Sequence, residues 1–66
     1  MSSFVWIRDI YNKQHYVNVD HIIRVSKYEI DAYVFLNGNH TTTSLVVDIK
    51  KIDDVIENIR RVELTR

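Results

Sequence analysis

The sequence lacks cysteine, any long apolar run and any excess of charge. Without cysteine, disulfides and thiolate zinc sites are excluded. No apolar run approaches the roughly 18 residues of a membrane span, so we expect no contact with a membrane. The first residues do not place a charged region before an apolar one, so we expect no signal peptide and a cytoplasmic protein. Nine Lys and Arg balance nine Asp and Glu, which gives no general attraction for nucleic acid.

The composition is that of a small globular protein, with 45% apolar and 27% charged residues. Sixty-six residues correspond to one domain, which we take as residues 1–66. A chain of this size buries only about 60% of the surface that its unfolded form exposes, so its core is marginal. Small domains compensate with disulfides, metals or partners. We therefore expect a protein partner or self-association into a homodimer or larger oligomer.

Stretches rich in β-branched and aromatic residues predict strands. They span residues 3–10, 15–19, 22–25, 31–37 and 41–47. The polar segment 11–14 predicts a turn, in which Asn12 is suited to a turn conformation. Asn18 and Asp20 favour a bend or a single helical turn before the third strand. Residues 26–30 are expected to form a loop.

The only glycine, Gly38, follows Asn37 between two predicted strands. Asn-Gly is typical of a type I′ hairpin turn, whose two central residues need a positive φ angle. A phosphate-binding loop would instead need several glycines and a following helix. We therefore predict a hairpin turn centred on Asn37-Gly38.

The C-terminal segment 48–64 changes to a helical period, with apolar residues three and four apart. The apolar residues are Ile49, Ile52, Val55, Ile56, Ile59 and Val62. Asp48 is predicted to be the N-cap, and the pairs Lys50–Asp54 and Glu57–Arg61 have the spacing for contact on the solvent side. The predicted fold is therefore α+β: a small antiparallel sheet of four or five strands, open or curled into a barrel, with one C-terminal amphipathic helix.

No catalytic, cofactor or metal site is predicted. The three histidines, His15, His21 and His40, have no metal-binding spacing, so only convergence through the fold would make them a site. The adjacent carboxylates Asp53 and Asp54 are better explained by a helix start than by acid–base chemistry. A chain this small also has little room for a pocket that excludes water. We therefore expect the protein not to be an enzyme.

Aromatic residues give strands with two apolar faces. Phe4 and Trp6 share one face of the first strand and Val5 and Ile7 the other. In strand 31–37, three aliphatic residues share one face and two aromatic residues the other: Ala32, Val34 and Leu36 against Tyr33 and Phe35. One helix covers only one face of a small sheet. The second face is therefore covered by curling into a barrel or by another subunit.

The candidate partner-binding residues are Trp6, Arg8, Tyr33 and Phe35. If Tyr33 and Phe35 continue the face that carries Trp6 and Arg8, aromatic and basic side chains alternate there as in a stacking platform for bases. Two functions follow. The favoured one is a non-enzymatic interaction or regulatory module that acts through protein–protein contacts. The alternative, which we rank lower, is a small β-rich protein that binds single-stranded nucleic acid.

Three stretches of the chain carry a family resemblance: HYVNVDHIIRV, DAYVFLNG and VVDIKKIDDVIENI. Their order resembles the small flagellar and swarming motility protein family (FlbD-like). The matching residues are Tyr16, Asn18, Asp20, Ile22, Leu36, Gly38, Val55, Ile56, Glu57 and Ile59. The chain departs from the family in a longer final hairpin strand and in the opening of its helix. The resemblance implies a non-enzymatic regulatory protein connected with motility.

Overall fold

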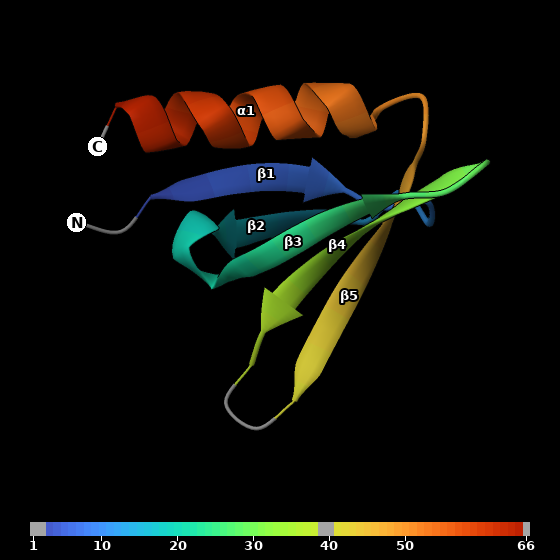
Figure 1. Cartoon of the computed structure of the whole chain (residues 1–66), viewed down its shortest axis with the longest axis horizontal. Helices are drawn as coiled ribbons and strands as arrows, with labels where there is room; N and C mark the ends of the chain where they lie inside the picture. The colour runs from blue at the N-terminus through green and yellow to red at the C-terminus, as the bar shows by residue number, and fades with distance from the viewer. Residues whose placement is uncertain (1–2, 39–40, 66) are drawn as a thin grey trace.

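The computed structural model describes residues 3–38 and 41–65, and it confirms the α+β class (Figure 1). In chain order, the described elements are β1 (Phe4–Arg8), β2 (Gln14–Asn18), the 3-10 turn η1 (Val19–His21), β3 (Ile22–Lys27), β4 (Asp31–Asn37), β5 (Thr42–Asp48) and α1 (Ile52–Leu64). These strands form two antiparallel sheets, β1–β2 and β3–β4–β5.

The five described strands neither form a single sheet nor close a barrel. The 3-10 turn η1 separates β2 from β3, and these two strands are not paired. The two sheets are linked near β5, where the backbone N–H of Ile10 donates to the carbonyl of Val46 at 2.9 Å. The division places each sheet's apolar face on a shared core and leaves each opposite face uncovered by the other sheet.

The turn between β1 and β2 is built around the Asp9 side chain. Its Oδ1 atom accepts hydrogen bonds from the backbone N–H groups of Tyr11, at 2.9 Å, and Lys13, at 3.0 Å. Asn12 has a positive φ of 65°, a conformation that asparagine tolerates better than most residues. The predicted turn role of Asn12 is therefore confirmed.

The predicted bend before the third strand is also confirmed. Asn18 caps η1, because its Oδ1 atom accepts a hydrogen bond from the backbone N–H of Asp20 at 3.0 Å. β3 runs to Lys27, two residues beyond the predicted end. A bulge between Ile22 and Arg24 leaves Ile23 exposed.

The predicted turn at Asn37-Gly38 is wrong in its centre. Asn37 pairs with Thr42, and the backbone N–H of Gly38 donates to the carbonyl of Thr41 at 2.9 Å. Gly38 therefore precedes the linking residues 39–40, which lie outside the described residues, and its φ is not positive. A Cβ atom at position 38 would lie 2.7 Å from the carbonyl oxygen of Thr41. The glycine is thus required by close approach of the backbone rather than by a left-handed φ.

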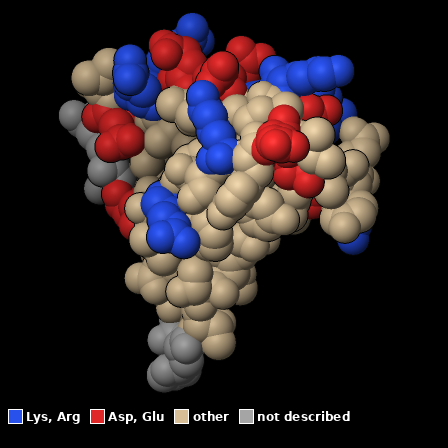
Figure 2. Space-filling model, turned by 45° about the vertical axis from the view of Figure 1, so that its right-hand side comes forward, with Lys and Arg blue, Asp and Glu red and all other residues tan. Residues whose placement is uncertain are grey.

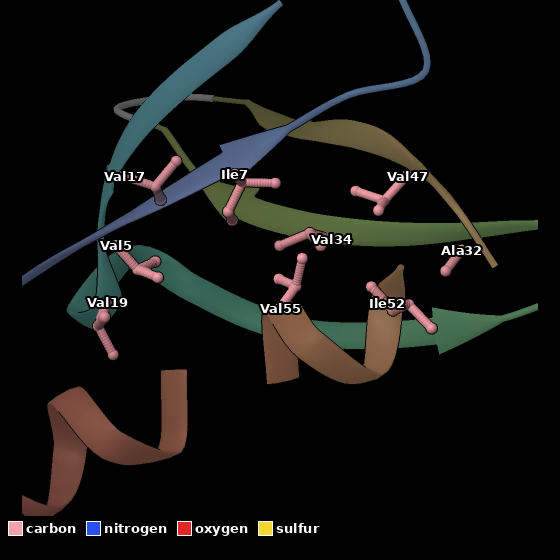
Figure 3. Packing of buried hydrophobic residues seen from close by; sticks show 9 residues of the cluster. All are labelled: Val5, Ile7, Val17, Val19, Ala32, Val34, Val47, Ile52 and Val55. Atoms are coloured by element: carbon pink, nitrogen blue, oxygen red, sulfur yellow. The ribbon is translucent and has the colours of Figure 1, made fainter. Parts of the chain in front are cut away.

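The core lies between the two sheets and α1. Figure 3 shows side chains of both sheets converging on it, with Ile7 of β1 and Val34 of β4 directed toward one another and Val55 of the helix beside them. The buried residues are Val5, Ile7, Val17, Val19, Ala32, Val34, Val47, Ile52 and Val55. The strict alternation of buried and exposed residues in β1 confirms the two faces predicted for that strand.

Helix α1 packs along β1 and η1 (Figure 1), and it begins later than predicted. Asp48 is the last residue of β5 rather than the N-cap, because its Oδ1 atom accepts from the backbone N–H of Lys50 at 2.9 Å and forms a turn before the helix. The predicted Lys50–Asp54 pair is consequently absent from the described residues. The predicted Glu57–Arg61 pair is present at 3.7 Å.

Candidate functional site

Three aromatic rings form a stack on the outer face of the β1–β2 hairpin. The register pairs Trp6 with Tyr16. The ring centroid of Tyr16 lies 4.5 Å from that of Trp6 and 4.8 Å from that of Phe4. The residues remain exposed, at 38% for Phe4, 55% for Trp6 and 57% for Tyr16. We call Phe4, Trp6 and Tyr16 the aromatic stack.

The stack points outward because the opposite face of the same strands is core. Val5 and Ile7 of β1 and Val17 of β2 are buried, and strand alternation then directs their neighbours outward. Arg8 ends this face, and its Nη1 atom donates to Oδ1 of Asn12 at 3.2 Å. The stack is therefore an apolar surface with a basic side chain at one end.

A second aromatic group lies on the outer face of the β3–β4–β5 sheet. The Tyr33 centroid is 6.1 Å from that of Phe35 and 5.3 Å from that of Tyr28. The guanidinium carbon of Arg24 lies 4.4 Å from the centroid of Phe35. Cation–π contacts of this kind are favourable within about 6 Å.

The four predicted partner-binding residues are therefore divided between the two sheets. Trp6 and Arg8 belong to β1, whereas Tyr33 and Phe35 belong to β4. Among the described residues, no ring contact joins the two groups. The continuous stacking platform considered from the sequence is thus replaced by two separate aromatic surfaces.

Tyr16 and Tyr28 were not among the predicted site residues. Tyr16 follows from the hairpin register, since the residue opposite an exposed Trp6 must share its face. Tyr28 lies in a segment expected to be an unspecific loop. Its signal in the sequence is weak: Glu29 follows it directly and Asp31 lies three residues after it.

Two open hollows on the described surface are lined mostly by apolar or aromatic side chains. One, of about 540 Å³, is lined by Tyr28, Glu29, Ile30, Asp31, Tyr33, Phe35 and Ser44. The other, of about 480 Å³, lies between β3 and the helix and is lined by Ile22, Val25, Ile56, Ile59, Arg60, Glu63 and Leu64. Figure 2 shows charged side chains of both signs gathered over the helix at the top of the view, whereas the surface over the lower part of the β4–β5 hairpin carries few.

Some titratable side chains of the described residues form structural contacts. Nε2 of His15 lies 2.8 Å from Oδ2 of Asp9. This hydrogen bond, followed by that from the backbone N–H of Lys13, holds the pKa of the Asp9 carboxyl below its ordinary value. Asp53 and Asp54 lie in the first turn of α1, as predicted. Nζ of Lys27 lies 2.7 Å from Oδ1 of Asp53.

The described residues were also compared with the requirements of a metal site and of a membrane-spanning helix. No three His, Cys, Asp or Glu side chains within them gather as metal ligands, and His40 lies outside the described residues. The same part of the chain has no helix with the length and apolar character needed to cross a membrane.

Comparison of the chain with models of protein families, with curated proteins and with solved structures finds no match.

Proposed function

We propose that the protein is a non-enzymatic interaction module that acts in the cytoplasm through protein–protein contacts. The observation that carries this proposal is the aromatic stack, three large side chains placed together on a rigid hairpin with their outer surfaces in solvent. Contiguous apolar patches on small proteins mark interaction sites. Trp and Tyr are also the residues that most often dominate binding energy at such sites.

The partner that fits the stack best is a second copy of the chain. The three side chains of the stack carry no charge, so two copies that meet through these rings leave none of the stack residues as a buried, unpaired charge. A two-fold axis through the stack would place the same rings of both copies against each other, which is the commonest arrangement of homo-oligomers. The resemblance to the FlbD-like family adds a biological setting, a regulatory role connected with motility.

Single-stranded nucleic acid is the alternative occupant. Its support is the presence of exposed rings and of Arg8 beside the stack. Against it, the second aromatic group is flanked by the carboxylates of Glu29 and Asp31, which repel phosphates, and one face of Phe35 is already occupied by Arg24. Protein contact therefore remains the better-supported proposal.

The fluorescence of Trp6, the only tryptophan, distinguishes these occupants. Self-association should shift the Trp6 emission to shorter wavelength as the protein concentration rises from the nanomolar to the high micromolar range. The Tyr11→Glu variant serves as control, because Tyr11 is exposed in the turn outside the stack, and it should behave like the parent. Emission that is independent of protein concentration but quenched by oligothymidylate, with steep dependence on salt, would favour nucleic acid and contradict the proposal.

A further inference from the structure

The two tyrosines of the second aromatic group form a corner. Their rings are nearly perpendicular, at 88°, with centroids 5.3 Å apart. Tyr28 comes from the β3–β4 turn, which is closed by a 2.8 Å hydrogen bond from its backbone N–H to the carbonyl of Asp31. A second hydrogen bond, from the N–H of Ile49 to the carbonyl of Ile30 at 3.2 Å, ties the turn to the end of β5. These two hydrogen bonds hold the backbone of the turn from which Tyr28 projects.

Carboxylates surround this corner without cations to neutralise them. Glu29 and Asp31 line the same hollow as the two rings, and neither forms an ion pair within the described residues. Asp31 also lies directly opposite Asp48 in the β4–β5 register. Like charges placed directly across a ladder destabilise a sheet, so this arrangement gains stability from any cation bound nearby.

No basic side chain of the described residues forms an ion pair with Glu29 or Asp31. Lys27 is paired with Asp53 of the helix at 2.7 Å, and Arg24 lies over Phe35. Lys50 lines a neighbouring hollow together with Glu29, Asp31 and Asp48, but no ion pair joins it to any of them. Glu29 and Asp31 therefore have no ion-pair partner within the described residues, and both carboxylates are available to a cation of a partner.

We propose that the corner formed by Tyr28, Tyr33, Glu29 and Asp31 binds a Lys or Arg side chain of a partner protein. An aromatic ring attracts a cation placed over its face, and the carboxylates supply the opposite charge. Exposed Ile30 gives the methylene stem of a long basic side chain an apolar surface to lie on. Arg24 over Phe35 already makes the same kind of contact within the chain. The inference rests on the proposed function only in taking the ligand to be a protein, because it does not use the aromatic stack.

The test is titration of the full chain, labelled with nitrogen-15, with a heptapeptide of alternating Lys and Ser, followed by amide chemical shifts. We expect the largest shifts in residues 28–35, with weakening as salt is added. A matched peptide with norleucine in place of Lys keeps the alkyl stem and removes the charge, and it should produce no such shifts. Tyr28→Ala should weaken binding of the Lys peptide by about two- to thirty-fold, the range expected for loss of a cation–π contact.

Charge variants separate this site from general attraction of a basic peptide to acidic groups. Asp31→Asn should weaken binding of the Lys peptide, whereas Asp54→Asn, an exposed acidic residue on the helix, should leave it unchanged. Equal weakening by both variants, equal binding of the norleucine peptide, or no shift in residues 28–35 at millimolar Lys peptide would each overturn the inference. Binding of the Lys peptide without any association through Trp6 would instead refute the proposed function and leave this inference standing.

Discussion

Gly38 lies at the end of the β4–β5 hairpin, at a position that leaves little space for a side chain. Its N–H bonds to the carbonyl of Thr41, and the same carbonyl occupies the space that a Cβ atom would need. We expect Gly38→Ala to lower the free energy of unfolding by about 1–3 kcal/mol, the usual cost of overpacking. Urea denaturation measures this, with Thr42→Ala in the exposed neighbouring strand as control. Equal midpoints for Gly38→Ala and the parent would contradict the close approach of the Thr41 carbonyl to position 38.

Asp9 gives the protein a defined response to acid. Because its pKa is lowered in the folded state, chiefly by the hydrogen bond with His15, its contribution to stability is present above about pH 4, the ordinary pKa range of Asp. That contribution is lost as the pH falls through the folded-state value. We expect Asp9→Asn to reduce the melting temperature at pH 7 and to flatten its fall between pH 5 and pH 2. Asp54→Asn should retain the full acid dependence, and an unchanged profile for Asp9→Asn would contradict this role.

Helix α1 stabilises the fold through the side chains that it buries in the core. Ile52 is fully buried at its first turn, whereas Ile59 is only half-buried further along. Ile52→Ala should cost about 2–5 kcal/mol by leaving a cavity, a large part of the stability of a small domain. Ile59→Ala should cost less, and exposed Asn58→Ala close to nothing, as measured by urea denaturation. Equal costs for Ile52→Ala and Asn58→Ala would show that α1 does not pack on the core through this turn.

The elements were predictable where the evidence is local. Alternation in β1 and β4 and the period of the C-terminal segment come directly from side-chain geometry, so their faces were predicted correctly. The helix start was not, because an aspartate before an apolar run suits an N-cap and a turn equally well, and Asp48 bonds to Lys50 in a turn. The centre of the β4–β5 turn was misplaced for a similar reason. An Asn-Gly pair predicts a turn nearby, but it does not fix which residues form the centre of that turn.

For the molecule as a whole, the sequence left open how the strands associate. Periodicity assigns a face to each strand but does not say which sheet it joins, so the separation of Trp6 from Tyr33 could not be predicted. The corner at Tyr28 depends on the same long-range placement, because its walls come from a turn and a strand. That a partner covers an outer face stays a prediction, and after this division it concerns each aromatic surface separately.

Sedimentation equilibrium of the full chain tests the proposed self-association through the aromatic stack most directly. We predict a mass above that of the 7.9 kDa chain at high micromolar concentration. Trp6→Glu should return the protein to the monomer, since a charge buried without a partner in an apolar interface costs several kcal/mol, while Tyr11→Glu should sediment like the parent. A parent protein that sediments as a single 7.9 kDa species throughout this range would contradict the account.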